Sequence, residues 1–208
     1  MKLMHLLLDE GEDDYTYSPT CSLGLLEKLA PDWVFFFHWS EMIEEEIYKN
    51  YKCICVHTGK LPGHRGGSPI QNQILENVIL TDVNLISVDK EVDSGKIYLK
   101  EQISLQGTLS DIWSSITRVA SKLIQRCVKE NPIPHVQVGT IHTFKRRSKQ
   151  PLDFNNSQNL SSLYDQIRMM DDDNYPTSYI MVGDYKLEFT RAHLNKNNLL
   201  TDVTITKQ

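Results

Sequence analysis

The chain has 208 residues, 40 % of them apolar and 24 % charged, and its net charge is −5. This length suits one domain with a sizeable core, or one domain with a small appendage. The acidic balance argues against a nucleic-acid partner, because phosphate binding needs a concentrated basic surface. No apolar run approaches the roughly 20 residues of a membrane span, and four irregularly spaced cysteines do not make a secreted disulfide framework. We expect a cytoplasmic protein with reduced thiols and no membrane partner.

Short apolar runs alternate with helical patterns in the first part of the chain. Trp33–His38 is apolar on both faces, as is typical of a central strand in a parallel sheet. Ser40 and the apolar and acidic residues after it indicate the start of a helix. The elements predicted here are a strand at Lys2–Asp9, a loop at Glu10–Tyr17, a helix between Ser18 and Pro31, strands at Trp33–His38 and Lys52–His57, and a helix from Ser40.

A loop rich in glycine and proline follows His57. Thr58–Pro69 holds four glycines and two prolines, which no regular element tolerates. Strand–helix alternation then resumes, which indicates an α/β fold with a mostly parallel sheet. The elements predicted beyond the loop are a helix from Ser68 to Leu75, strands at Val78–Val88 and Lys96–Leu105 around a turn at Asp89–Gly95, and an amphipathic helix from Thr108 to Lys129.

The pattern changes after Asn131, where prolines and polar residues precede a helix at Leu160–Met170. A hairpin at Tyr179–Arg191 and a last strand near Val203 are predicted next. We therefore expect a main domain at residues 1–150 and a small helix and β-hairpin appendage at 151–208. The apolar residues of the appendage exceed what it can bury by itself, which predicts a homodimer.

Polar residues gather where the predicted strands end, and open parallel sheets place their sites at the carboxyl ends of strands. His57 ends one strand, Asp93 lies in the turn after the following strand, and His38 and Trp39 end a third strand. A histidine and an aspartate on adjacent strand ends can form a hydrogen bond that orients the imidazole. We expect His57 and Asp93 to lie within hydrogen-bond reach at this edge.

Two motifs around these residues resemble those of the formyltransferase family. Cys55–Pro62 followed by Arg65–Gln71 is similar to the pattern Asn-x-His-x-x-x-Leu-Pro, Arg-Gly, Pro-Ile/Leu-Gln. Val92–Ile97 is similar to a second pattern, Leu-Asp-x-Gly-Asp-Ile. The two lie in the family's order and about the expected distance apart.

Two further segments, Phe144–Arg147 and Tyr164–Met170, resemble the subgroup that acts on nucleotide-linked amino sugars. Methionyl-tRNA formyltransferases are related in the first half but carry a larger C-terminal barrel. The resemblance implies a Rossmann-like formyltransferase fold with residues 1–150 as the catalytic domain. Because only 56 residues precede His57, we expect a shortened N-terminus that lacks an early strand–helix unit.

The resemblance also implies the chemistry. Such enzymes take a formyl group from 10-formyltetrahydrofolate, without a metal, and an acceptor amine attacks the formyl carbon. His57 is then the proton acceptor or oxyanion partner, and Asp93 fixes its protonation state. The position of the family's third catalytic residue, an Asn, is held here by Cys55, and a thiol is a much poorer hydrogen-bond donor than a carboxamide.

Other site residues follow from the same resemblance. The expected acceptor is an amino sugar linked to UDP, dTDP or GDP, of the 4-amino-4,6-dideoxyhexose type, whose product feeds a surface polysaccharide or a pseudaminic-type sugar. The residues assigned to the folate are His38, Trp39, Asp89, Val92 and Asp93, and those assigned to the acceptor are Lys60, Arg65, Gly66, Gly67, Gln71, Lys145 and Arg146.

Alternatives stay open at this point. Cys53, Cys55 and His57 share one face of a strand, but neighbours on one face are about 7 Å apart, too far for three ligands on one metal ion. Formyl transfer needs no covalent intermediate, which argues against Cys55 as a nucleophile. The chain can also be a formyl-folate hydrolase, or a catalytically silent protein that binds folate or a sugar nucleotide.

Overall fold

The computed structural model describes residues 3–9, 13–147, 151–155, 157 and 159–208. The chain clusters into two compact units. The first unit comprises Met1–Gly66, Thr81–Ile103 and Ile116–Thr143, and the second comprises Gly67–Leu80, Ser104–Ser115 and Phe144–Gln208.

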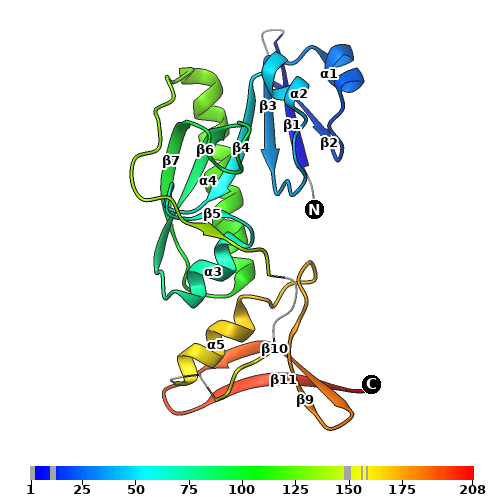
Figure 1. Cartoon of the computed structure of the whole chain (residues 1–208), viewed down its shortest axis with the longest axis vertical. Helices are drawn as coiled ribbons and strands as arrows, with labels where there is room; N and C mark the ends of the chain where they lie inside the picture. The colour runs from blue at the N-terminus through cyan, green and yellow to red at the C-terminus, as the bar shows by residue number, and fades with distance from the viewer. Residues whose placement is uncertain (1–2, 10–12, 148–150, 156, 158) are drawn as a thin grey trace. The chain divides into compact units, whose positions relative to one another are not determined.

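The first unit is built on a mixed six-stranded sheet (Figure 1). The β3/β4 pair is parallel, whereas β1/β2, β1/β3 and β4/β6 are antiparallel. The predicted α/β class is confirmed, but the sheet is mixed where a mostly parallel one was expected. In sheet order the strands are β2 (Asp13–Ser18), β1 (Leu3–Asp9), β3 (Trp33–Phe37), β4 (Cys53–Thr58), β6 (Leu80–Ser87) and β7 (Ile97–Ser104).

The connection after β4 contains α3 (Pro69–Leu75) and leads to β6, which runs back against β4. The chain re-enters the sheet near the point where it left, because Val83 of β6 pairs with Thr58 at the end of β4. The Gly59 N–H donates to the Asp82 carbonyl at 2.8 Å, which joins the end of β4 to the start of β6.

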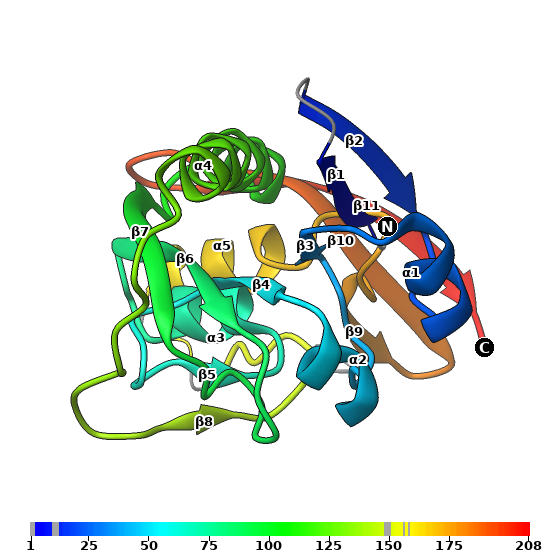
Figure 2. The ribbon, with the colours of Figure 1, turned by 90° about the horizontal axis from the view of Figure 1, so that it is seen from above.

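The helices of this unit follow the apolar pattern of the sequence. α4 (Leu109–Glu130) buries a continuous stripe, as predicted, and Figures 1 and 2 show it beside β6 and β7. From its part within the first unit, Lys122 forms a 2.7 Å ion pair with Glu101 of β7. None of the described helices is long and apolar enough to cross a membrane. The buried positions of α4 are Leu109, Ile112, Ile116, Val119, Ala120, Leu123, Ile124 and Cys127.

Local boundaries differ from the prediction near the N-terminus. The expected loop at Glu10–Tyr17 contains β2, because its tyrosines and threonine favour a strand that pairs with β1. α1 (Leu23–Leu29) is capped by Ser22, whose side chain accepts from the Leu25 N–H. α2 (Glu45–Asn50) begins five residues after Ser40.

The second unit contains a three-stranded antiparallel sheet with α5 (Leu160–Arg168) packed against β10. Ile167, Leu152 and Phe189 form its core. The predicted helix, hairpin and last strand are therefore present. In sheet order the strands are β11 (Leu199–Lys207), β10 (Tyr185–Leu194) and β9 (Ser178–Val182). A separate two-stranded sheet pairs β5 (Arg65–Gly66), which belongs to the first unit, with β8 (Thr143–Phe144), where the division between the units falls.

Candidate active site

His57 lies near the end of β4 and meets an oxygen at each ring nitrogen. Its Nδ1 is 3.3 Å from Asp93 Oδ2, and its Nε2 is 2.6 Å from the His64 backbone carbonyl. The side chain is 6 % exposed. The predicted approach of His57 to Asp93 is therefore present within the first unit.

These two contacts constrain the protons of the ring. A carbonyl oxygen only accepts hydrogen bonds, so Nε2 carries a hydrogen toward His64. An ionised carboxylate also only accepts, so the contact with Asp93 requires a hydrogen on Nδ1. A neutral ring carries one hydrogen and satisfies one of these contacts at a time, whereas a doubly protonated ring satisfies both.

The environment of Asp93 favours its ionised form. Burial raises the pKa of the carboxyl, but the hydrogen bond and charge of His57, the Gly66 N–H and the charge of Arg65 together outweigh it and hold the pKa below its ordinary value. The Gly66 N–H donates to Asp93 Oδ2 at 2.8 Å. The backbone of Asp93 is left-handed, with φ of 53°, an uncommon conformation for a non-glycine residue that often marks functional sites.

Asn84 is a site residue that the sequence analysis missed. It lies on β6 directly opposite His57 and is fully buried. Its Nδ2 donates to the carbonyls of His57 (3.2 Å), Gly59 (2.7 Å) and Asp82 (3.2 Å). This carboxamide fixes the end of β4, and its position within the apolar run Val-Asn-Leu-Ile was the available signal.

Gln137 was also missed. Its Oε1 accepts from Arg65 Nε (3.1 Å) and Nη2 (2.9 Å). Its Nε2 donates to the carbonyls of Asp93 and Gly95, each at 2.8 Å. Arg65, assigned above to the acceptor, is 8 % exposed and bound in this network.

Gly59 allows the loop to fold over the imidazole. A Cβ at this position would lie 2.7 Å from the His64 carbonyl oxygen and 3.1 Å from His57 Nε2. A side chain does not fit there without displacing the backbone of the loop. Lys60 is exposed, and its N–H donates to His64 Nδ1 at 3.3 Å.

Cys55 lies two residues before His57 on the same strand. Burial, with a smaller effect of the Asp93 charge, raises the pKa of its thiol to about 12. The thiol therefore stays protonated near neutral pH and is not a nucleophile there. Its Sγ donates a weak hydrogen bond to the carbonyl of Val56, at 3.8 Å.

With this geometry in view, comparison with known proteins assigns the family. Residues 18–128 match the Formyl transferase family, and residues 151–206 match the family described as Methionyl-tRNA formyltransferase, C-terminal domain. A methionyl-tRNA formyltransferase from Clostridium thermocellum is 32 % identical, with a TM-score of 0.85 over 90 % of this chain and 83 % of that chain. The chain belongs to the formyl transferase family.

Other relatives are less similar in sequence and match this chain over only part of their length. The methionyl-tRNA formyltransferase of Rickettsia typhi is 25 % identical over 195 residues, which are 88 % of this chain. The match spans 64 % of the length of that relative. An N-formyltransferase from Helicobacter canadensis, solved with folinic acid and dTDP-3-aminofucose, shares the fold at 16 % identity, with a TM-score of 0.55 over 74 % of this chain and 68 % of that chain.

The positions that the formyltransferase resemblance assigns to folate lie in the first unit. Trp39 packs edge-on against Phe36 at 5.3 Å and belongs to the same apolar cluster as Cys55 and Val88. His38 has a left-handed backbone with φ of 54°. Asp89 and Val92, in the loop that follows Val88, are both exposed.

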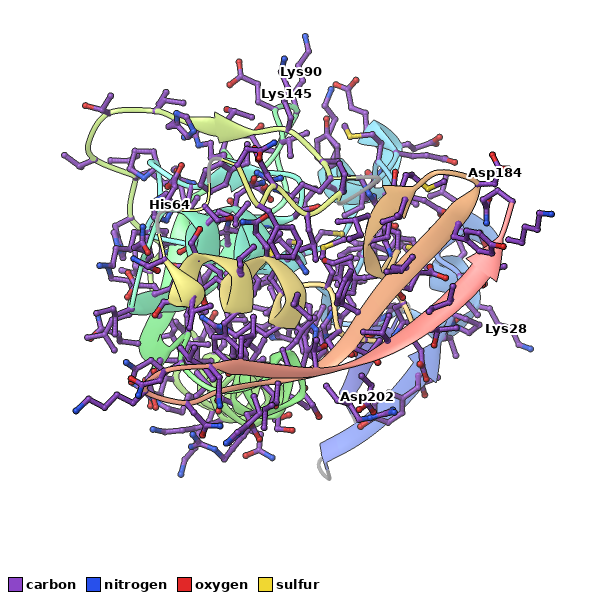
Figure 3. All side chains as sticks on the ribbon, turned by 90° about the horizontal axis from the view of Figure 1, so that it is seen from below. Lys28, His64, Lys90, Lys145, Asp184 and Asp202 are labelled. Atoms are coloured by element: carbon purple, nitrogen blue, oxygen red, sulfur yellow. The ribbon has the colours of Figure 1, made fainter. Side chains whose placement is uncertain are left out.

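The positions that the resemblance assigns to the acceptor are divided between the units. Lys60, Arg65 and Gly66 belong to the first unit, and the others to the second. In the second unit Gln71 is 1 % exposed, and its Nε2 has no hydrogen-bond partner among the described residues. Lys145 and Arg146 are exposed, and Figure 3 shows the Lys145 side chain pointing outward.

Neighbouring contacts in the second unit hold this basic segment. Arg147 Nε donates to Asn72 Oδ1 at 2.8 Å, and Asn72 Nδ2 donates to the Lys145 carbonyl at 3.2 Å. A Cβ on Gly67 would lie 2.7 Å from Arg146 Cβ, so this close approach requires glycine. Within the described part of the chain, no three His, Cys, Asp or Glu side chains are arranged to hold a metal.

Proposed function

We propose that this protein transfers the formyl group of 10-formyltetrahydrofolate to the amine of a nucleotide-linked amino sugar. The observation that carries the proposal is the His57–Asp93 contact, 3.3 Å long, beside the Gly66 N–H and the Arg65 guanidinium. An imidazole held by an ionised carboxylate can take and return one proton. Membership of the formyl transferase family supplies the reaction class.

The folate fits the residues of the first unit. Trp39, Cys55 and Val88 pack on one apolar cluster, and the loop from Val88 continues to Asp93. Apolar side chains and backbone polar groups therefore lie beside the His57–Asp93 pair. This combination suits a flat heterocycle that carries a reactive group. When bound, the folate supplies an activated formyl carbon.

The chain's own groups then handle charge and protons. With its single hydrogen on Nδ1 toward Asp93, neutral His57 can accept a proton from the attacking amine at Nε2, whereas the doubly protonated ring can donate a hydrogen bond to the formyl oxygen as negative charge develops there. Asp93 stabilises the imidazolium in either role. In the structure His57 Nε2 faces the His64 carbonyl, so engaging a substrate through Nε2 requires that this peptide moves.

Charge supports the choice of acceptor. A net charge of −5 does not suit a polyanionic RNA, whereas one nucleoside diphosphate needs only a few cations. Lys145, Arg146 and Arg147 supply such a group in the second unit. The Helicobacter canadensis structure, which holds dTDP-3-aminofucose, shares the fold.

A second acceptor is favoured by a different observation. The relative at 32 % identity is a methionyl-tRNA formyltransferase, and residues 151–206 match the C-terminal domain described for such proteins. The amine of methionyl-tRNA is therefore the rival acceptor. Water as acceptor would make the protein a hydrolase.

One assay separates these candidates. The protein is incubated with 10-formyltetrahydrofolate and either UDP-, dTDP- and GDP-linked amino sugars or methionyl-tRNA, and the products are analysed by mass spectrometry. A gain of one carbonyl mass on a sugar nucleotide is the expected result. Formylation of methionyl-tRNA alone would replace the acceptor, folate turnover without an acceptor would indicate a hydrolase, and absence of turnover would leave a binding protein.

A further inference from the structure

The side chain of Gln137 makes four hydrogen bonds, and all of them end on groups that hold Asp93 or the loop beside it. Oε1 accepts twice from Arg65, whereas Nε2 donates to the carbonyls of Asp93 and Gly95. Arg65 precedes Gly66, whose N–H binds the Asp93 carboxylate at 2.8 Å. Gln137 therefore contacts Asp93 from the backbone side and, through Arg65, from the side of the carboxylate.

The segment around Gln137 has little other reason to be fixed. Residues 131–134 and 136–138 form no helix or strand. Val136 is 61 % exposed and Val138 is 84 % exposed, whereas Gln137 between them is partly buried. The backbone of this segment is held by the bridge between His135 and Ile97, and at its start by the bond from the Asn131 N–H to the Cys127 carbonyl. The side chain of Gln137 is therefore held inward by the groups that it binds, and not by a helix or strand.

We propose that Gln137 is a positioning residue that holds Asp93 against His57. Asp93 adopts a left-handed backbone conformation, with φ of 53°, which is less favourable for a non-glycine residue and is stabilised where the surrounding structure fixes it. Gln137 binds the carbonyls on both sides of Ser94, and so fixes the peptide that carries the carboxylate. The catalytic part of this inference rests on the proposed formyl transfer.

Only a carboxamide meets the demands of this position. One end must accept from a guanidinium and the other must donate to two carbonyls. A glutamate keeps the acceptor for Arg65 but loses the donors and faces the carbonyls of Asp93 and Gly95 with negative charge. A leucine loses both functions and leaves the guanidinium without this acceptor.

The test compares Gln137→Glu and Gln137→Leu with Gln125→Leu, an exposed glutamine on α4, as the matched control. Formyl-transfer kinetics give kcat and KM separately, and NMR of the His57 ring gives the resonance of the hydrogen on Nδ1. We expect both Gln137 variants to lower kcat about 10- to 100-fold, as loss of an outer hydrogen-bonding partner typically does. KM for the folate should change little, the Nδ1–H resonance should move or broaden, and Gln125→Leu should match the parent.

Each other outcome is informative. Full activity of Gln137→Glu would mean that Gln137 serves Arg65 alone, and an unchanged Nδ1–H resonance in Gln137→Leu would overturn the proposal. If Gln137→Leu does not fold, Gln137→Glu carries the decision, because it preserves size and the Arg65 contact. If the parent protein has no transferase activity, the proposed function fails, and the NMR comparison still decides the role of Gln137.

Discussion

His57 and Asp93 define the first prediction. Replacing either residue with Asn removes the coupled imidazole and carboxylate while conserving size, so the rate of formyl transfer should fall by about 10²–10³ or more. Folate affinity should stay nearly unchanged, because the pair acts on the reacting groups. Steady-state kinetics and equilibrium binding of 10-formyltetrahydrofolate measure the two quantities. Glu91→Gln, an exposed change in the same loop, is the control and should leave both as in the parent, whereas a loss confined to folate binding would contradict the assigned roles.

The same carboxylate predicts how stability depends on pH. The pKa of Asp93 is lower in the folded state than its ordinary value of about 3.9. Ionised Asp93 therefore stabilises the fold above about pH 4, and this contribution is lost as the pH falls through the folded pKa. Urea unfolding between pH 3 and pH 7 should show that Asp93→Asn is less stable than the parent at pH 7. As the pH falls below about pH 4, the free energy of unfolding should fall less for Asp93→Asn than for the parent. Parallel curves for the two proteins would refute the coupling.

Cys55 is the point at which this chain departs from the family pattern. Burial raises the pKa of its thiol to about 12, and the thiol donates weakly. Cys55→Ala should therefore reduce turnover less than about tenfold, far less than the loss of a dedicated oxyanion donor. Cys55→Asn should keep or raise the rate if the strand presents the carboxamide as in the family. An inactive Cys55→Ala protein that still binds folate would show that the sulfur takes part in the chemistry.

At the level of elements, the His57–Asp93 pair was predicted correctly but for an incomplete reason. Both residues were expected at the same edge of a parallel sheet, yet β4 and β6 are antiparallel. Asp93 follows β6 beside the start of β4, where the Val88 N–H donates to the Cys53 carbonyl at 3.0 Å. The loop after Val88 then runs back alongside β4 and brings Asp93 to His57. The length of β4 that it follows, from Cys53 to His57, is about 13 Å. Sequence patterns identify strands from burial, but they do not carry the direction in which neighbouring strands pair.

The remaining differences have similar physical causes. Buried strands and amphipathic α4 were predicted because their side-chain periodicity is local. β2 was missed because its acidic and tyrosine-rich composition obscures pairing that depends on β1. Asn84 and Gln137 were missed because a carboxamide becomes informative only when its partners, distant in sequence, are known.

The loop between β6 and β7 supplies a prediction for an element. A Cβ on Gly95 would lie 1.6 Å from the Ser87 carbonyl oxygen, so Gly95→Ala must displace the loop and with it Asp93. We expect a lower melting temperature and loss of transferase activity, measured by calorimetry and by the formyl-transfer assay. Gly24→Ala in α1 is the matched control, since a Cβ there meets nothing within 4 Å, and it should be neutral or stabilising by up to about 1 kcal/mol. Equal behaviour of the two variants would contradict this account.

For the whole molecule, the residues assigned to chemistry and those assigned to the acceptor fall largely in different units. His57, Asp93, Asn84 and Gln137 all belong to the first unit, so the hydrogen bonds and ion pair that join His57 and Asp93 to their neighbours lie within it. The basic segment at Lys145–Arg147 belongs to the second. Changes in this segment should therefore act on KM for the acceptor rather than on the His57–Asp93 contact.

The surface of the second unit bears on the predicted homodimer. The apolar residues of α5 that suggested a dimer, such as Leu163 and Ile167, are buried within the chain. Strand β11, however, is at the edge of its sheet. The strand register places four apolar side chains on one face of that sheet, and each is 44–64 % exposed. Two come from β11 and one each from β10 and β9, and we call the set the β11 patch: Val203, Ile205, Tyr185 and Val182.

We expect the β11 patch to be covered in a two-fold dimer, because an exposed edge strand with apolar side chains favours pairing and closed two-fold pairs are the commonest assemblies. Light scattering at micromolar concentration should give about twice the chain mass of 24.0 kDa. Val203→Lys should give a monomer, since a buried lysine in the interface lacks a partner. Thr204→Lys, on the neighbouring residue and therefore on the opposite face of β11, is the control and should remain dimeric. A parent protein of 24.0 kDa would disprove the dimer, and a dimeric Val203→Lys protein would place its interface elsewhere.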